Sequence, residues 1–293
     1  MHPSGVMPSV MGRASTADGL ALLTRHWQTD GPWASVLLVH GLGEHSGRYE
    51  HVGDHFAAAG LDTYAYDHRG NGGSDGARGD IDRWSRYHDD MAERLAAVRT
   101  AADGRPVAVF AHSMGGLIAA GYLLSDRPRP DMTVLSAPGL DSTLARWKIA
   151  LAPLMGRVLP GLSVPIGVRM ETLSRDPEIG RRAFADPLNG RACTARFGAE
   201  AVHEQRRVSA RAKAIGGPTL VIHGTDDGLV PVSASEPFDG APGVERRTYP
   251  GLRHEMHNEP EWRDVLDDVV GWIRERATLQ AQPNTASGER VER

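Results

Sequence analysis

Residues 107–124, VAVFAHSMGGLIAAGYLL, place one serine between a strand-forming run and a helix-forming run. The first four residues are apolar and β-prone, and the last nine have the composition of a buried helix. Ser113 therefore falls on a sharp strand-to-helix turn, with the small residues Ala111 and Gly115 two places before and after it. This pattern is typical of a nucleophile elbow, a strained turn that exposes the serine oxygen while backbone passes close on both sides. Ala111 stands where the pattern usually has glycine, and its methyl group is the smallest addition that the turn has to accommodate.

A serine hydroxyl is a poor nucleophile, so it needs a base, and the base needs an orienting acid. In folds with such an elbow, the three residues run along the chain in the order Ser, Asp, His. The strand-like run Thr219–Gly224 is followed by the adjacent Asp226 and Asp227, and a later loop carries His254 and His257. The carboxyl ends of strands are where α/β sheets collect their site residues. Order and context thus predict a catalytic triad, while spacing leaves both aspartates and both histidines open.

A second loop has the composition of an oxyanion hole. The apolar run Ser35–Val39 reads as a buried parallel strand and leads into a loop that contains Gly41 and Gly43. Two glycines allow the backbone to turn its N–H groups toward an incoming carbonyl oxygen. In this type of site, one donor comes from such a loop and the other from the residue after the nucleophile. The backbone N–H groups of Leu42 and Met114 are therefore the predicted donors.

Longer motifs give a more specific resemblance. Together with the elbow, four stretches resemble the monoacylglycerol lipase family: HGLGEHSGRY at 40–49, YDHRGNGGSDG at 66–76, LSAP at 135–138 and YPGLRHE at 249–255. The matches extend from about Gly19 to about Arg276, nearly the whole chain. The resemblance implies an α/β-hydrolase fold with a cap, which cleaves monoacylglycerols into fatty acid and glycerol and needs no cofactor.

The resemblance also resolves the choices that spacing leaves open. It implies that Ser113 is the nucleophile, Asp227 the acid and His254 the base. Asp226 is then expected to be a turn former or helix cap. His257 is expected to be a surface histidine or one that packs against the catalytic residues.

The polar end of the substrate pocket follows from the same resemblance. It implies that Glu44, Arg48 and His112 line this end. Residues alone offer the simpler interpretation of a surface ion pair between Glu44 and Arg48. The chain departs from the family pattern at Ala111 and at Asn71, where histidine is more usual, and neither position belongs to the predicted triad.

Composition is that of an ordinary globular enzyme. The 293 residues are 40% hydrophobic and 24% charged, and the net charge of −4 gives no electrostatic footprint for nucleic acid. The single cysteine, Cys193, excludes an intrachain disulfide and suits a reducing, cytoplasmic compartment. The 13 histidines are scattered without H-E-x-x-H or C-x-x-C spacing, so no metal site is expected. No signal peptide and no membrane-spanning run of about 18–20 apolar residues is apparent.

Strand and helix signals alternate along most of the chain. We expect an N-terminal hairpin within 19–27, strands over 35–39, 62–66 and 132–136, an amphipathic helix over 81–101 and a last helix over 261–276. Such alternation predicts a mostly parallel central sheet with helices on both faces. The expected core comprises residues 15–138 and 213–277, with flexible tails over 1–14 and 278–293.

The alternation breaks over residues 139–212, which we predict to form an inserted, mainly helical cap. Strand signals vanish there and prolines become frequent. The apolar segment around Ile149 and Leu154 contains Pro153 and Gly156, which argue against one long regular helix. We expect Ile149 and Leu154 to wall an acyl tunnel, and the segment also suits peripheral contact with a lipid surface.

The sequence thus predicts a serine ester hydrolase acting on a monoacylglycerol or similar lipid ester. The alternatives within this chemistry are a lysophospholipase and a short-chain carboxylesterase. A hydrolase-fold binding protein without catalysis is the alternative outside it, and the intact Ser113, Asp227 and His254 argue against it. Oligomeric state leaves no signal in the sequence.

Overall fold

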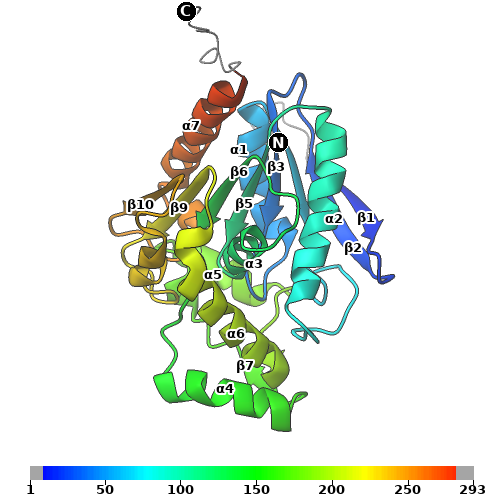
Figure 1. Ribbon diagram of the computed structural model, residues 1–293. Helices are drawn as coiled ribbons and strands as arrows, with labels where there is room; N and C mark the ends of the chain where they lie inside the picture. The colour runs from blue at the N-terminus through cyan, green and yellow to red at the C-terminus, as the bar shows by residue number, and fades with distance from the viewer. Residues whose placement is uncertain (1–8, 282–293) are drawn as a thin grey trace, which may run out of the picture.

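The computed structural model describes residues 9–281, which are built around an eight-stranded sheet of order β1-β2-β4-β3-β5-β6-β9-β10 (Figure 1). The strands are β1 (Val10–Ser15), β2 (Ala21–Trp27), β3 (Ala34–Val39), β4 (Leu61–Tyr66), β5 (Val107–His112), β6 (Met132–Ser136), β9 (Thr219–Gly224) and β10 (Val244–Tyr249). From β4 to β10 all neighbours pair in parallel, whereas β2 runs antiparallel to both β1 and β4. The predicted mostly parallel sheet is therefore correct, with an antiparallel hairpin at one edge.

Helices cover both faces of the sheet. One face carries α1 (Glu50–Ala58) and α7 (Trp262–Ala281), and the other carries α2 (Ser85–Ala102) and α3 (Met114–Leu123). Strand β5 shows how two cores arise from one strand, because successive side chains point to opposite faces. Val109 packs with the α2 and α3 core, while the next residue, Phe110, packs with the α1 and α7 core. Every residue of β5 is buried, as expected for a strand covered on both sides.

The two ends of the chain differ from the expected tails. Residues 10–15 form β1, so the expected tail over 1–14 is wrong for this part, and residues 1–8 lie outside the described residues. The expected hairpin within 19–27 is instead a single strand, β2, whose hairpin partner is β1. At the other end α7 continues to Ala281, and residues 282–293 lie outside the described part.

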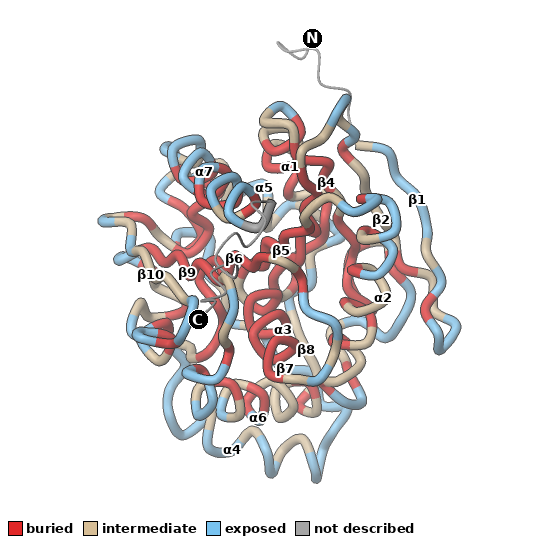
Figure 2. The backbone as a smooth tube through the Cα atoms, turned by 45° about the horizontal axis from the view of Figure 1, so that its top comes forward, coloured by how far each residue is buried: buried red, intermediate tan, exposed pale blue. Residues whose placement is uncertain are grey.

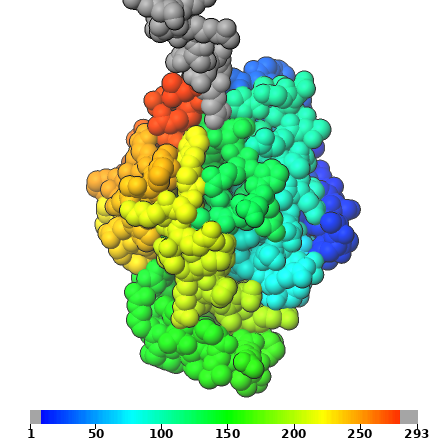
Figure 3. All heavy atoms as spheres, in the orientation of Figure 1, coloured from blue at the N-terminus to red at the C-terminus, as the bar shows by residue number. Residues whose placement is uncertain are grey.

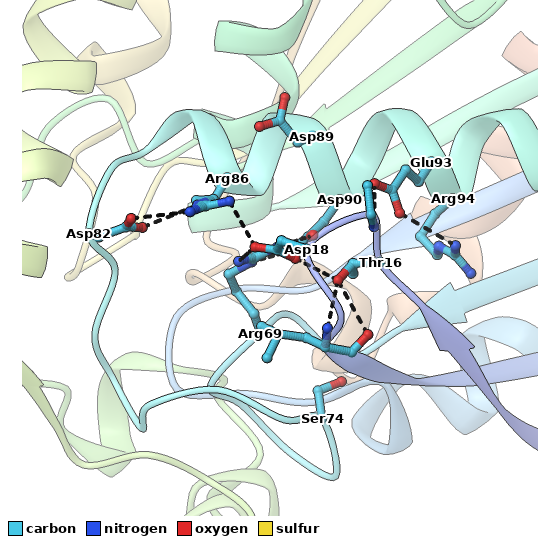
Figure 4. A network of polar contacts seen from close by, with 12 residues as sticks. Thr16, Asp18, Arg69, Ser74, Asp82, Arg86, Asp89, Asp90, Glu93 and Arg94 are labelled. Atoms are coloured by element: carbon cyan, nitrogen blue, oxygen red, sulfur yellow. Dashed lines mark hydrogen bonds and ion pairs between the residues drawn. The ribbon is translucent and has the colours of Figure 1, made fainter.

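A charged network fastens the edge hairpin to the rest of the fold (Figure 4). The Arg69 guanidinium, in the loop after β4, donates to Asp90 of α2 at 2.6 and 2.7 Å. It also donates to Asp18, in the turn between β1 and β2, at 2.9 and 3.1 Å. Arg86 of α2 donates to Asp18 as well, at 2.8 Å. Bidentate arginine–carboxylate pairs fix the orientation of the two side chains as well as the distance between them. The turn between β1 and β2 is therefore held in a defined position against the loop after β4 and helix α2.

Three α-helices and two short strands between β6 and β9 stand outside the central sheet. We call residues 139–212 the insertion. It contains α4 (Arg146–Val158), β7 (Ser163–Pro165), α5 (Pro177–Ala185), β8 (Ala192–Thr194) and α6 (Ala195–Arg211). Of these, α4, β7 and α6 gather at one end of the molecule (Figures 1 and 3). The insertion is mainly helical, as expected, but β7 and β8 pair as a short antiparallel ribbon that the sequence did not signal.

Helix α4 corrects a second expectation about the insertion. It is one continuous helix of 13 residues that runs through Pro153, although a proline inside a helix removes one backbone hydrogen bond. Packing against α6 offers a physical reason. A Cβ atom on Gly156 would lie 2.4 Å from Cβ of Ala199, so only glycine lets the two helices approach this closely.

Candidate active site

Ser113 occupies a strained turn between β5 and α3. Its φ of 55° and ψ of −115° lie where residues with a side chain are rarely found. The turn is possible because the second residue of the helix that follows, Gly115, is a glycine. A Cβ on Gly115 would lie 2.2 Å from the carbonyl oxygen of Val39, so any larger residue would push α3 away from β3. Ala111 is fully buried in β5 and adopts an ordinary strand conformation, which explains why its methyl group is accommodated.

Three chain segments bring the predicted triad together. His254 Nε2 lies 2.9 Å from Ser113 Oγ, and His254 Nδ1 lies 2.7 Å from Asp227 Oδ2. The other carboxylate oxygen of Asp227 accepts the backbone N–H groups of Leu229 and Val230, at 2.8 and 2.9 Å. These bonds fix the carboxylate in the orientation that faces the imidazole. The serine follows β5, the aspartate follows β9 and the histidine follows β10, at the carboxyl edge of the sheet.

The structure also distinguishes Asp227 from Asp226 and His254 from His257. Asp226 is exposed and accepts a hydrogen bond from the neighbouring Thr225 hydroxyl, so it does not face the site. His257 is buried and stacks on Tyr49, with ring centroids 4.8 Å apart. Of the histidine and aspartate chosen from the family resemblance, His254 contacts Ser113 and Asp227 contacts His254.

The interaction between the charges of Asp227 and His254 sets the protonation state of both residues. Burial favours the neutral forms of both groups, raising the pKa of Asp227 and lowering that of His254. The charge of each partner and the hydrogen bond between them outweigh burial. The net result is a lowered pKa for Asp227 and a raised pKa for His254. Asp227 thus carries a fixed negative charge that stabilises an imidazolium at His254.

The loop after β3 lies against the nucleophile. A Cβ on Gly41 would be 3.2 Å from Cβ of Ser113, so the backbone of this loop passes directly beside the serine. Leu42 follows on this loop, and Met114 is the first residue of α3. Gly41 is thus the residue of this loop that lies beside Ser113, and the roles of the Leu42 and Met114 N–H groups as oxyanion donors stay a prediction.

A buried ionic cluster lies beside the triad. Arg48 contacts Glu44 at 3.0 Å and Glu255 at 2.7 Å, and the side chain of Glu255 has no exposed surface. Glu44 also accepts the Tyr49 hydroxyl at 2.8 Å, and Glu255 accepts the Asn258 amide at 2.7 Å. The expectation of a surface ion pair between Glu44 and Arg48 is therefore wrong, since both side chains are nearly buried.

Glu255 is a site residue that sequence reasoning missed. Its signal was its position directly after the loop histidine, His254, in the motif YPGLRHE. Burial opposes ionisation of Glu255, but Arg48 lowers its pKa to about 2. Burial raises the pKa of Glu44 in spite of Arg48. Arg48 is thus paired most firmly with Glu255.

His112 occupies a different place from the one expected. It is the last residue of β5, has no exposed surface, and its ring lies 4.7 Å from that of His257 and 4.8 Å from that of His254. His112 therefore packs against the rings of His254 and His257 in the protein interior. It does not line the pocket surface in this structure.

The two insertion residues predicted to wall an acyl tunnel also differ from each other. Ile149 is half-buried on the side of α4 that faces α6, together with Ala152 and Gly156. Leu154 is 55% exposed and lies on the opposite side of the helix. Leu154 is therefore not a wall residue in this structure, because its side chain faces outward.

Other chemistries find little support among residues 9–281. Burial raises the pKa of the Cys193 thiol to about 11, which keeps it protonated and unreactive at neutral pH. Within this part of the chain, no cluster of three or more histidine, cysteine or acidic side chains has the geometry to hold a metal ion. None of the described helices combines the length and apolar character needed to cross a bilayer.

Comparison with known proteins places the fold and the family. A family model described as serine aminopeptidase, S33, matches residues 30–261. The monoacylglycerol lipase of Mycolicibacterium smegmatis is 35% identical over 263 residues, which cover 87% of this chain and 93% of that protein. The crystal structure of the Paleococcus ferrophilus monoacylglycerol lipase superposes with a TM-score of 0.75 at 29% identity, covering 92% of this chain and all of that one.

A third similarity concerns the fold alone. A soluble variant of the Saccharomyces cerevisiae monoglyceride lipase, solved with a substrate analogue, has a TM-score of 0.84 at 20% identity and covers 94% of this chain and 99% of that one. Together the matches confirm the predicted α/β-hydrolase fold. They also confirm the resemblance from which Asp227 and His254 were chosen.

Proposed function

The chain belongs to the family described as serine aminopeptidase, S33, and from that premise we propose that it hydrolyses the ester bond of monoacylglycerols through an acyl-enzyme intermediate. The observation that carries the chemistry is the series of hydrogen bonds from Ser113 to His254 and from His254 to Asp227. Ser113 itself lies on a strained turn. The substrate class is supported by similarity, over most of the chain, to proteins named monoacylglycerol lipases.

The geometry suggests the order of events. Ser113 Oγ attacks the acyl carbonyl while His254 Nε2, at 2.9 Å, takes its proton. Asp227 holds the imidazole with Nδ1 protonated and stabilises the imidazolium. The N–H groups of Leu42 and Met114 bind the oxyanion, and each such donor contributes about 3–4 kcal/mol to transition-state stabilisation. Water activated by His254 then releases the fatty acid from Ser113.

We further propose that the ionic cluster binds the alcohol half of the substrate. Arg48 and Glu44 follow the oxyanion loop, and Arg48 retains a small exposed fraction, 11% of its side chain. If Arg48 contacts glycerol hydroxyls, Arg48→Ala lowers the rate on a monoacylglycerol more than on a p-nitrophenyl ester of the same acid. Equal losses on the two substrates would remove this role.

The outer face of α4 supports contact with a lipid surface. Trp147, Leu151, Leu154 and Val158 recur at spacings of four, three and four residues, so they share one side of the helix. They are 65%, 39%, 55% and 62% exposed. An apolar stripe of this kind suits adsorption to lipid, where a monoacylglycerol substrate resides.

The decisive experiment is a substrate profile with a matched inactive variant. We expect the purified protein to hydrolyse monooleoylglycerol faster than lysophosphatidylcholine, p-nitrophenyl butyrate or emulsified trioleoylglycerol. Ser113→Ala, which removes one hydroxyl, is expected to abolish all of these activities. Preference for the lysophospholipid or the short ester would favour the corresponding alternative, and activity that persists in Ser113→Ala would refute the serine mechanism.

A further inference from the structure

The loop that carries Leu42 is held by a reciprocal pair of buried histidines. The backbone N–H of His68 donates to His40 Nε2 at 2.9 Å, and the ring Nε2 of His68 lies 2.9 Å from the carbonyl oxygen of His40. The other ring nitrogen of His40, Nδ1, lies 2.8 Å from the carbonyl oxygen of Gly41. Both imidazoles are almost completely buried.

These partners fix the tautomer of His40. A backbone N–H only donates, so His40 Nε2 has to be the acceptor of the His68 N–H. The ring proton of neutral His40 therefore sits on Nδ1, where it donates to the Gly41 carbonyl. Burial, opposed by the Asp67 charge and the Gly41 carbonyl, lowers the pKa of His40 to about 4. The ring is thus neutral at pH 7, as its acceptor role requires.

Fixing the Gly41 carbonyl also fixes the next N–H group. A trans peptide unit is planar, and its C=O and N–H point in opposite directions. Because the Gly41 carbonyl points toward the His40 ring, the Leu42 N–H points away from that ring. The Gly41 backbone passes beside Ser113, with an imagined Cβ only 3.2 Å from the serine Cβ. The preceding peptide is held as well, since the Gly41 N–H donates to Glu44 at 3.2 Å.

We propose that His40 is a positioning residue, which orients the Gly41–Leu42 peptide so that the Leu42 N–H faces the oxyanion. This inference rests on the proposed serine-hydrolase function and extends it to a residue that contacts no substrate. The imidazole acts through its Nδ1–H, and the His68 backbone ensures that the proton resides there.

Two variants of similar polarity separate this role from simple packing. In His40→Asn the side-chain amide nitrogen is attached to Cγ, as Nδ1 is, so it reaches the Gly41 carbonyl. In His40→Gln the amide lies one bond further out, near the position of Nε2, and the donor to Gly41 is lost. We expect His40→Asn to keep kcat within about tenfold of the wild type. His40→Gln is expected to lose about 100- to 1,000-fold in kcat, the usual effect of losing one oxyanion donor, with little change in KM.

A transition-state analogue gives a readout that a merely structural role would not change. Ser113 Oγ adds to the carbonyl carbon of a trifluoromethyl ketone, its proton passes to His254 Nε2, and the carbonyl π electrons become the charge on an oxyanion. The inhibition constant should therefore rise in His40→Gln by about the factor by which kcat/KM falls, and should stay near the wild-type value in His40→Asn.

His88 provides a matched control. It is a buried histidine of α2 whose Nε2 lies 3.3 Å from Glu204, away from the triad. His88→Gln should lower the melting temperature without changing kcat or inhibitor affinity. Equal kcat in His40→Asn and His40→Gln would overturn the proposal, and so would a loss above tenfold in a folded His40→Asn, even if His40→Gln does not fold. Failure of the underlying function would appear separately, as activity that persists in Ser113→Ala.

Discussion

Helices α3 and α4 are both rich in apolar residues, yet all ten residues of α3 are buried and none of the 13 in α4 is (Figure 2). Helix α3 lies against β3, β5 and α6, so the chain itself covers it on every side. Helix α4 packs only along the side that faces α6 and leaves its other side open. Similar residues thus end in different surroundings: in α3 they pack in the core behind the nucleophile, and in α4 they stay exposed on the outer side of the helix.

Charged side chains show the same division. Beside the triad, Arg48 is held between Glu44 and Glu255, and all three are nearly out of contact with solvent. In the insertion, Arg182 pairs with Glu178 across one turn of α5, and the arginine is 76% exposed. Losing one partner of a buried pair leaves an uncompensated charge, whereas an exposed pair exchanges its partner for water. The core should therefore tolerate few polar changes and the insertion many.

The largest effect is expected at the strained serine itself. Ser113→Gly removes the nucleophile and should lower kcat by about a millionfold, as the loss of a triad serine does elsewhere. Glycine tolerates a positive φ, so the same change should raise the free energy of unfolding by about 1 kcal/mol. Turnover of monooleoylglycerol and a thermal unfolding curve measure the two effects.

Asp103 supplies the control for the strain argument. It is an exposed residue at the end of α2 with a φ of 49°, far from the site. Asp103→Gly should bring a similar gain in stability with full activity. A gain in Asp103→Gly and none in Ser113→Gly would mean that the elbow stores no strain.

The second effect concerns the aspartate that orients the base. Asp227→Asn should lower kcat by about 10,000-fold, because the imidazole loses its tautomer. The Asp227 charge raises the pKa of His254 above its ordinary 6.5, and the base works only when neutral. The acid limb of kcat/KM should therefore lie above pH 6.5 in the wild type and move to lower pH in the residual activity of Asp227→Asn. Asp226→Asn should keep full activity, and the reverse result would show that the wrong aspartate was chosen.

The sequence specified the core of the site well because each of its parts is local. The elbow needs only a strand, a small residue on either side of Ser113 and a helix, and these lie within 18 residues. The choice between Asp226 and Asp227 was different in kind. Adjacent residues have the same spacing to every other motif, and only the tertiary structure shows that one is exposed and the other buried.

Other misses have equally physical causes. Strand β1 is an exposed edge strand, so its sequence lacks the alternation of apolar residues that marks a buried one. His112 was placed in the pocket by the family resemblance, but as the last residue of β5 it is fully buried. Leu154 was placed inward because it is apolar, and apolar character alone cannot tell a buried side of a helix from an exposed one.

The third effect tests the contrast between the two kinds of ion pair. Arg48→Ala leaves Glu44 and Glu255 buried without their cation and should cost about 3–5 kcal/mol in the free energy of unfolding. Arg182→Ala removes an exposed pair and should cost less than about 1 kcal/mol. Urea unfolding at pH 7 measures both. Equal costs would mean that the cluster beside the triad behaves as a solvated pair.

The destabilisation caused by Arg48→Ala should depend on pH, because the ion pair requires an ionised Glu255. Arg48 depresses the pKa of Glu255 in the folded state to about 2, below its ordinary value of 4.5. The stabilisation from this carboxylate is therefore fully present above pH 4.5 and is lost as the pH falls toward 2. The difference in the free energy of unfolding between the wild type and Arg48→Ala should therefore become smaller as the pH falls from 4.5 to 2. The small loss of unfolding free energy in Arg182→Ala should change little over the same range.

The smallest effect on the folded protein, and the most selective one, is expected on the outer face of α4. Replacing Trp147, Leu151 and Leu154 by serine removes exposed side chains, so the melting temperature should change by no more than about 1 °C. If this face adsorbs to lipid, each lost apolar group weakens binding at about 0.8 kcal/mol per buried CH₂, and the triple variant should bind phosphatidylcholine vesicles at least about tenfold more weakly. Turnover of dissolved p-nitrophenyl acetate should be unchanged, while turnover of vesicle-borne monooleoylglycerol should fall.

Leu279→Ser, which removes a leucine that is 56% exposed on α7 outside the insertion, is the matched control and should alter neither binding nor turnover. Unchanged vesicle binding in the triple variant would show that the open side of α4 is not a lipid surface, and the contrast between α3 and α4 would then need a different partner.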